Sequence, residues 1–267
     1  MSRSIKRSKT TTDIYHIVHF ESDDSIYVFF KKCNFNCRGC IKEKSPWDSH
    51  IPDKHIKKLQ NAGKLETLDL DGLKKIIDSK KPQKAVLGGG EPTVDENISN
   101  IVRILNENDT RTVLLSNGYF LDEEFSRKLI SSGLKEACIS IKSIDEAMHR
   151  NYTSMDNKRV LNNFKTLNDE RITLRSESVL IPGLIGTNEI ESVADFVSSV
   201  NPKIPFRIDP FKEVPSLDYR SPSTEEMKEA QARAEDHLES VSYLNPDAPT
   251  TGEVSVLYPN LQEEGKP

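Results

Sequence analysis

Residues 26–40 read IYVFFKKCNFNCRGC and join a run of strand-forming residues to three closely spaced cysteines. The run Ile26–Lys32 is rich in β-branched and aromatic residues, which favour a buried strand. Cys33, Cys37 and Cys40 follow at once with the spacing C-x3-C-x2-C. In barrels of parallel strands the active site lies at the carboxyl ends of the strands. The stretch therefore predicts a strand that leads directly into a metal-binding loop.

Three thiolates in one short loop point to a particular kind of iron site. They can hold three irons of a cubic [4Fe–4S] cluster and leave the fourth iron open to a substrate. Phe35, between the cysteines, is expected to pack over the cluster and shield it from water. A closed zinc site with Cys138 as the fourth thiolate is the alternative. Structural zinc sites usually pair two knuckles, however, and Cys138 lies alone in an apolar strand, where a free cysteine is usually a small core residue.

The composition is that of a globular protein kept in a reducing compartment. Four cysteines among 267 residues are too few for a disulfide framework. No signal peptide and no apolar run of membrane-spanning length is visible, so we expect a cytoplasmic protein without a membrane partner. The net charge of −5 lacks the basic footprint of a nucleic-acid-binding protein. One basic stretch, at Arg3, Lys6, Arg7 and Lys9, is interpreted as a solvated tail, with contact to a phosphate backbone or an acidic partner as the alternative.

Apolar runs alternate with amphipathic stretches through most of the chain. The expected strands are Ile26–Lys32, Ala85–Leu87, Thr112–Leu115, Glu136–Lys142, Ile172–Ile181 and Ile204–Asp209. The expected helices between them are Asp69–Ser79, Asp95–Asn108, Asp122–Ser132, Lys158–Asn168 and Asn188–Val200. Such alternation predicts an α/β fold with parallel strands and right-handed helical crossovers. Six such units form an open, partial (βα)6 barrel similar to part of a TIM barrel.

The chain is expected to divide into three parts around this barrel. A basic, disordered tail covers residues 1–14, the partial barrel covers residues 15–215, and a C-terminal extension covers residues 216–267. Within the extension we expect a polar helix at Ser223–Ser240, a short strand at Glu253–Tyr258 and a frayed end.

A second motif closes the strand after the cysteine loop and reads Gly88-Gly89-Gly90-Glu91. A glycine run lets the backbone come close to a ligand and bond it through N–H and C=O groups. Glu91 adds a carboxylate that can pair with an ammonium group. Ser116 and Asn117 end the next strand. Because the carboxyl ends of parallel strands meet at one edge, we expect these groups to lie beside the cysteines.

From Cys33 to about Lys212 the chain resembles the radical S-adenosylmethionine (radical SAM) superfamily. It most resembles the short activating enzymes of glycyl-radical proteins, such as the pyruvate formate-lyase activating enzyme. The cysteine spacing is similar to the superfamily signature, and Gly88–Glu91 looks like its GGEP element, which binds the amino group of the methionine moiety. Further similar stretches are Ile139–Lys142, Met148–Thr153, Val179–Gly183 and Asp209–Lys212. The resemblance implies a [4Fe–4S] cluster and S-adenosylmethionine (SAM) as cofactors.

The resemblance also implies cofactor contacts for individual residues. Lys142 matches a SAM-contacting lysine of the family, while Ser140 and Lys212 match contacting positions with changed chemistry. The third strand ends Leu115-Ser116-Asn117-Gly118 where the activating enzymes read D-T-N-G, and Ser140 stands where they have aspartate. Those two carboxylates help to bind a monovalent cation and the nucleoside in the activating enzymes. The changes argue against that cation site and leave the superfamily resemblance intact.

Charged residues on the last two strands form a further candidate site. Arg175 and Glu177 are two residues apart and therefore share one face of their strand, as do Arg207 and Asp209. Charges that face the inside of a barrel are costly unless they are paired or bound to a ligand. We interpret them as a charged pocket for the SAM carboxylate or the substrate. Structural ion pairs or solvent-facing side chains are the alternative.

The resemblance implies an oxidoreductase that cleaves SAM reductively and abstracts a substrate hydrogen. A short single-cluster barrel with an open side suits a protein loop, so activation of a glycyl-radical protein is the leading hypothesis. It would require an electron donor of the flavodoxin or ferredoxin type. Modification of an RNA or a small molecule is a second hypothesis, and a noncatalytic zinc or iron–sulfur module is a third. Nucleic acid is the less favoured kind of partner.

Overall fold

A nine-stranded sheet forms the centre of the computed structural model, which describes residues 10–61, 65–245 and 252–260. The strand order is β8-β7-β6-β5-β4-β3-β2-β1-β9. Strands β2 to β8 are parallel, whereas β1 lies antiparallel between β2 and β9. The strands are β1 Ile14–Phe20, β2 Ser25–Phe30, β3 Lys84–Gly88, β4 Arg111–Ser116, β5 Glu136–Ser140, β6 Thr173–Leu180, β7 Phe206–Pro210, β8 Val241–Tyr243 and β9 Val254–Tyr258.

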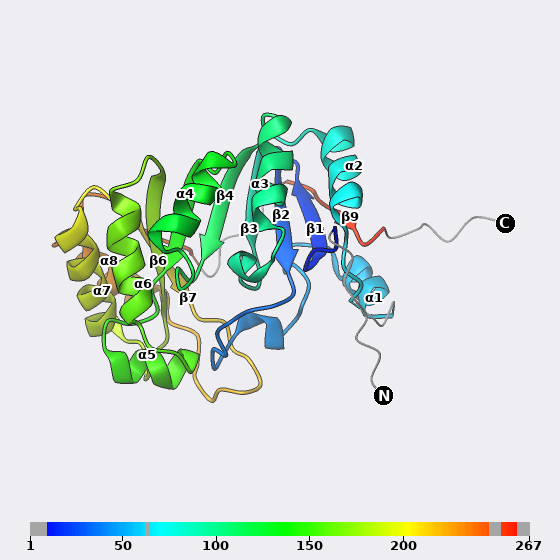
Figure 1. The fold of residues 1–267 in the computed structure, drawn as a ribbon. Helices are drawn as coiled ribbons and strands as arrows, with labels where there is room; N and C mark the ends of the chain where they lie inside the picture. Colours follow the sequence, from blue (N-terminus) through cyan, green and yellow to red (C-terminus); the bar gives the residue numbers. More distant parts are fainter. Residues whose placement is uncertain (1–9, 62–64, 246–251, 261–267) are drawn as a thin grey trace, which may run out of the picture.

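Most helices pack on one face of this sheet (Figure 1). The helices are α1 Asp53–Asn61, α2 Leu70–Lys80, α3 Ile98–Glu107, α4 Glu123–Ser131, α5 Glu146–Thr153, α6 Lys158–Asn168, α7 Thr187–Val200 and α8 Thr224–Glu235. Helix α1 is an exception, because its Leu59 packs with Tyr15, Val18 and Trp47 in a separate small core. No helix within the described ranges combines the length and the apolar character needed to cross a bilayer.

The two faces of the sheet differ in character because side chains alternate along each strand. The face covered by helices, here the outer face, carries the fully buried residues Val28, Leu87, Leu114 and Ile139 among others. The opposite face, here the inner face, carries partly exposed apolar residues between β2 and β4 and charged residues on β6 and β7. The main hydrophobic core therefore lies on the outer face, and the inner face keeps side chains that could contact a ligand.

The structure confirms the predicted α/β class with mainly parallel strands, and β2 to β7 are the six predicted strands. Two strands were not predicted. Strand β8 has only three residues, and β1 contains His16 and His19, which obscure its apolar pattern. The polar helix predicted to reach Ser240 is too long, because α8 ends at Glu235 and the chain turns into β8.

The predicted tail over residues 1–14 ends too late. Residues 1–9, with all four basic residues of the tail, lie outside the described part of the chain. The Thr12 N–H donates a hydrogen bond to the Leu68 carbonyl oxygen at 3.2 Å, Asp13 is buried, and Ile14 begins β1. The chain is thus already packed before residue 15. The frayed end predicted at Leu261–Pro267 also lies outside the described residues.

We expect the two faces of β3 to differ in their contribution to stability. Leu87 on the outer face is fully buried, so Leu87→Ala should lower the free energy of unfolding by about 2–5 kcal/mol. Val86, its neighbour on the inner face, is partly exposed, so Val86→Ala should cost about 1 kcal/mol or less. Chemical denaturation of the two variants measures both values. Equal losses would show that the inner face carries as much of the core as the outer face.

Candidate active site

Three predicted motifs meet at the carboxyl edge of the parallel strands. The cysteine loop follows β2, the glycine run follows β3, and Ser116-Asn117-Gly118 follows β4 (Figure 1). The Glu91 N–H donates to the Lys32 carbonyl oxygen at 2.8 Å, which joins the glycine run to the start of the cysteine loop. The Asn117 side-chain amide donates to Asn34 Oδ1 at 2.8 Å, which joins the third motif to the same loop. Hydrogen bonds therefore connect all three motifs.

The cysteine loop is fixed to helix α5 through its backbone. The Asn36 N–H donates to the Thr153 carbonyl oxygen at 3.0 Å, and the Arg38 N–H donates to the Tyr152 carbonyl oxygen at 2.8 Å. The buried Phe35 ring packs edge-on against His149 of α5, with 5.7 Å between the ring centroids. Phe35 was expected to shield the loop from water, and its place between loop and helix suits that role.

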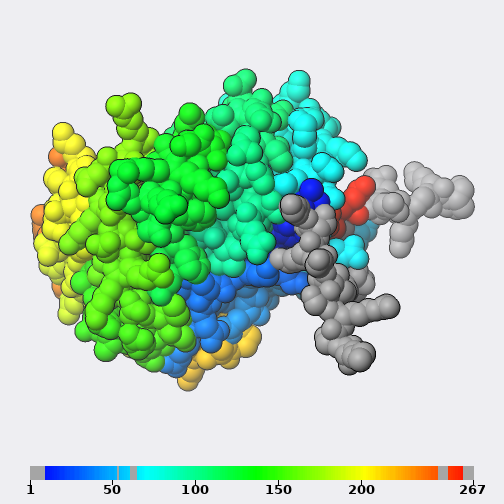
Figure 2. Space-filling view, in the orientation of Figure 1, coloured from blue at the N-terminus to red at the C-terminus, as the bar shows by residue number. Residues whose placement is uncertain are grey.

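On its other side the loop lies against residues 211–222. Figure 2 shows the loop in blue beside this segment in gold, at the lower edge of the molecule. Gly39 has a φ of +82°, and a Cβ atom there would lie 2.5 Å from Leu217 Cδ1 and 2.9 Å from Phe211 Cε2. A glycine is needed at this position because the backbone is left-handed and the contact is close.

The three thiols of the loop are free and accessible to different degrees. Cys33 is exposed, whereas Cys37 and Cys40 are partly buried. Burial raises the pKa of Cys37 to about 12, and the nearby Lys142 ammonium acts in the opposite direction. Among the described residues no three His, Cys, Asp or Glu side chains are already grouped as a metal site, so the sulfurs must turn toward one point to bind iron.

The fourth cysteine lies in a different environment. Cys138 is buried on the inner face of β5, with its sulfur 3.8 Å from Glu177 Oε2. Burial and the Glu177 carboxylate raise the pKa of Cys138, and the other charges that act on it are on β6 and β7, not on the cysteine loop. The donors of the loop are thus three thiols without a fourth cysteine beside them. This set fits a cluster with one open iron better than a closed zinc site.

The Glu91 carboxylate is engaged within the protein, and its pairing with an ammonium group stays a prediction. The side chain is 2% exposed, and Oε1 accepts hydrogen bonds from the Thr93 N–H, the Thr93 hydroxyl and the Ser116 hydroxyl at 2.6–3.1 Å. Oε2 accepts from the Asn117 N–H at 2.7 Å. Burial raises the pKa of Glu91, and these donors oppose the rise. With four donors from the protein, the carboxylate holds the β3 and β4 loops together.

The glycine run also has a packing role. A Cβ atom on Gly90 would lie 2.2 Å from the Lys32 carbonyl oxygen and 2.5 Å from that of Phe30. The backbone after β3 can therefore approach the end of β2 only because residue 90 has no side chain. Close approach to a ligand, the role expected for Gly88, Gly89 and Gly90, stays a prediction.

Four polar residues meet on the inner face, on β5, β6 and β7. The Ser140 hydroxyl donates to Glu177 Oε1, and Arg207 Nη2 donates to Glu177 Oε2 at 2.5 Å. Arg207 Nε also donates to Asp209 Oδ1 at 2.7 Å. Burial and the Glu177 carboxylate raise the pKa of Asp209 to about 6, although Arg207 opposes the rise. Asp209 belongs with this site, and its position two residues after Arg207 was the signal for it.

Not all predicted residues join this cluster. Arg175 shares the inner face but pairs with Glu136 at 2.6 Å, at the amino-terminal end of β5, where Arg111 also contacts Glu136. It therefore lies away from the edge that carries the cysteines, in a structural ion pair. Lys142 lies at that edge, two residues after the carboxyl end of β5, and its charge acts to lower the pKa of both Cys37 and Asp209. Lys212 is exposed in the segment that follows β7.

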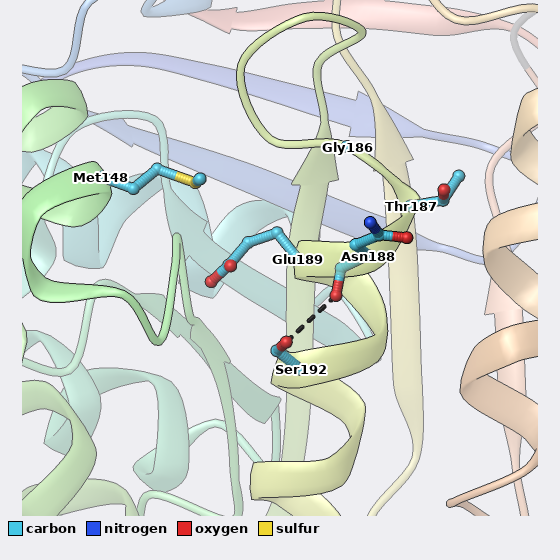
Figure 3. A pocket seen from close by; sticks show the side chains of 6 residues that line it. All are labelled: Met148, Gly186, Thr187, Asn188, Glu189 and Ser192. Carbon is cyan, nitrogen blue, oxygen red and sulfur yellow. Dashed lines mark hydrogen bonds between the residues drawn. The ribbon is translucent and has the colours of Figure 1, made fainter.

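A separate pocket lies between α5 and the start of α7 (Figure 3). It is lined by Met148, Gly186, Thr187, Asn188, Glu189 and Ser192, none of which was predicted to bind a cofactor. Glu189 Oε1 accepts hydrogen bonds from the Ser143 hydroxyl and the Ile144 N–H at 2.6–2.7 Å. The Ser192 hydroxyl donates to the Asn188 carbonyl oxygen at 3.1 Å. These contacts give Glu189 a structural task in holding the loop after β5.

The sequence matches a family model described as the Radical SAM superfamily over residues 27–197. A Methanocaldococcus jannaschii protein, provisionally named a glycyl-radical enzyme activating enzyme, is 27% identical over 240 residues, which cover 88% of this chain and 86% of that protein. A GTP 3′,8-cyclase of Campylobacter jejuni is 25% identical over 183 residues, which cover 66% of this chain. The match spans only 52% of the cyclase.

The fold also resembles a solved structure, a domain of a pyruvate-formate lyase-activating enzyme from Bacteroides vulgatus. The TM-score is 0.53 at 18% sequence identity, and the match covers 60% of this chain and 98% of that domain. At this identity the similarity concerns the fold.

We expect Glu91→Gln to weaken the contact between the β3 and β4 loops. The amide nitrogen of the glutamine would face a group that now donates a hydrogen bond to Glu91, such as the Asn117 N–H or the Ser116 hydroxyl, and that bond would be lost. The loss should lower the free energy of unfolding by about 1–3 kcal/mol. Denaturation of the protein without cofactors measures the change. Glu96→Gln, an exposed neighbour, is the control and should have no measurable effect. Equal stability of both variants would mean that the hydrogen bonds of Glu91 do not hold these loops.

Asp209 should give the protein a pH-dependent stability. Its pKa of about 6 in the folded state is above the ordinary value of 3.8, so folding favours the protonated form. The stabilisation is therefore complete below about pH 4 and is lost as the pH rises through about 6. The unfolding free energy of the wild type should fall across this window relative to that of Asp209→Asn. Parallel curves for the two proteins would contradict the raised pKa.

Proposed function

The chain belongs to the radical SAM superfamily, and from this premise we propose that it is an oxidoreductase that binds its cluster through Cys33, Cys37 and Cys40. Its cofactors are those of the family, a [4Fe–4S] cluster and SAM. The observation that carries the proposal is the group of three free thiols in one loop at the carboxyl edge of a parallel sheet. When bound, these cofactors supply a one-electron route to hydrogen abstraction from a substrate.

Residues around the loop prepare the site for such chemistry. Phe35, packed against His149, keeps water from one side of the loop. The Lys142 ammonium favours the thiolate form of Cys37, which is the form that binds iron. The Glu91 carboxylate holds Ser116 and Asn117 in place at the edge where SAM would lie. These residues position and protect the cofactors, and the cofactors supply the reactive groups.

The proposed substrate is a glycyl-radical protein. The similarity to the Methanocaldococcus jannaschii protein over most of both chains supports this reading. The inner face supports it as well, because Val86, Val113 and Leu115 are only partly buried there and present apolar surface that a protein loop could cover. The reaction requires an electron donor of the flavodoxin or ferredoxin type. The four free cysteines suit a reducing compartment such as the cytoplasm.

A small-molecule substrate is the second candidate. The match to a GTP 3′,8-cyclase supports it, although it spans about half of that enzyme. Leu115 and Ser140 also support it, because they stand at the two positions where activating enzymes resembling this chain have aspartate. The two candidates differ in the size of the substrate that must reach the inner face.

The first test is cleavage of SAM by the reconstituted protein. We expect the reduced wild type to produce 5′-deoxyadenosine, measured by liquid chromatography and mass spectrometry. Cys37→Ala should reduce the product to background, because only two loop thiols remain to hold the cluster. Cys138→Ala is the matched control and should retain the iron content and the product, since Cys138 contacts Glu177 on the inner face. Equal iron content in all three proteins would refute the assignment of the ligands.

The substrate class needs a second measurement. The reduced enzyme and SAM are mixed with a candidate glycyl-radical protein encoded near its gene, or with GTP. We expect the electron paramagnetic resonance doublet of a glycyl radical in the first mixture. Conversion of GTP in the second mixture, with no doublet in the first, would favour the small-molecule candidate instead.

A further inference from the structure

The cysteine loop and its flanks form a basic patch on an acidic protein. Residues 31–44 contain five basic residues and one acidic residue, a net charge of +4, whereas the whole chain has a net charge of −5. The basic residues are Lys31, Lys32, Arg38, Lys42 and Lys44, and all except the partly buried Lys42 are exposed. One of the five is already paired, because Lys32 Nζ lies 2.9 Å from Asp13 Oδ2. The surplus of positive charge therefore surrounds the predicted cluster ligands.

An exposed apolar side chain stands inside this patch. Ile41 follows Cys40 directly and is 46% exposed. In the described part of the chain, Leu244 is the other exposed large hydrophobic residue, at 47%. An apolar centre with a polar and charged rim is the usual anatomy of a protein interface. Ile41 and the basic residues around it, here the Ile41 patch, have that arrangement.

The Ile41 patch is held in one shape. Lys42 Nζ donates to the Lys31 carbonyl oxygen at 2.8 Å and stands over the Tyr15 ring at 5.6 Å. The Glu43 N–H donates to the Cys40 carbonyl oxygen at 2.9 Å, which closes the short turn that presents Ile41. A surface that is already ordered loses little conformational entropy when a partner binds.

Acidic side chains limit the patch on one side. A shallow hollow of about 520 Å³ is lined by Lys44 and by most residues of the segment 213–220, including Glu213 and Asp218. Arg220 in this segment is already engaged by Glu226 at 2.7 Å. Beyond Lys44 the basic residues Lys212 and Arg220 are mixed with these acidic ones, so the purely basic footprint stays small. Weak electron-transfer complexes have small interfaces, with less than about 1,200 Å² of total surface buried.

We propose that the Ile41 patch docks an acidic electron-transfer protein, with Ile41 as the apolar anchor and the basic residues as the charged rim. This inference rests on the proposed function, because the donor delivers one electron to the oxidised cluster held by the loop. The donor's reduced flavin or iron–sulfur centre loses that electron, and no bond forms or breaks. The patch fits this partner for two reasons. Its positive charge complements an acidic partner, and it includes the residue bonded to the predicted ligand Cys40.

The test compares a protein reductant with a small chemical one. The reconstituted enzyme is mixed with a flavodoxin in its hydroquinone form or with dithionite, and the loss of cluster absorbance is followed by stopped flow. We expect Ile41→Asp to slow reduction by flavodoxin at least tenfold and to leave reduction by dithionite unchanged. Leu244→Asp, with the same chemical change at equal exposure, should match the wild type with both reductants.

A charge variant tests the rim without altering the anchor. Lys44→Glu should also slow reduction by flavodoxin, whereas Lys75→Glu, at an exposed position of helix α2, should not. The wild-type rate with flavodoxin should fall as added salt shortens the Debye length from about 30 Å to about 10 Å. A flavodoxin titration, followed by a change in its flavin absorbance, gives the dissociation constant of each variant as a second readout.

Several results would overturn the docking surface. Equal rates with flavodoxin for all variants would remove the patch as the docking site. Slower reduction of Ile41→Asp by dithionite as well would mean that Ile41 acts on the cluster. If Ile41→Asp were reduced normally but lost glycyl-radical formation, the patch would belong to the substrate protein. If the wild type retained no iron, the proposed function itself would fail, and the docking surface would fail with it.

Discussion

The buried carboxylate of Glu91 is the contact that holds the site together. Its backbone N–H bonds the strand end that leads to the cysteines, and its two oxygens accept hydrogen bonds from the loops after β3 and β4. Asn117, held by Glu91, in turn donates to Asn34 inside the cysteine loop. A carboxylate with so many donors tolerates burial, because the donors replace the water that it loses. Without it, the loops after β2, β3 and β4 would lose the hydrogen bonds that Glu91 makes between them.

The division of the sheet into two faces explains why this site lies where it does. The outer face takes up the apolar residues of the strands and packs them against the helices, so the core leaves no room there for a ligand. Charged residues of β6 and β7 turn to the inner face, where Arg207 bridges Glu177 and Asp209. Burial of these charges is tolerable because they are paired. Binding groups and an open surface thus occur on the same face.

Much of this arrangement could be read from local patterns. The spacing of Cys33, Cys37 and Cys40 and the alternation of strands and helices predicted the fold class and the edge at which the motifs meet. The contacts of Glu91 with Thr93, Ser116 and Asn117 were not predicted, because an acidic residue after a glycine run looks free to bind an ammonium group. Arg175 was placed in the site because it shares a face with Glu177. Two residues on one face of a strand can still point toward opposite ends of it, and Arg175 pairs with Glu136 at the amino-terminal end of β5.

The order of residues along the chain is therefore enough to predict the class of fold, a candidate loop for binding iron and the superfamily. These features depend on spacing and periodicity over a few residues, and both are visible in the sequence. The partners of Glu91, the ion pair of Arg175 with Glu136 and the exposure of Ile41 depend on residues that are distant in the chain. Such contacts arise only when β3 to β6 lie side by side and the loops pack on one another. Burial and pairing are therefore properties of the folded molecule.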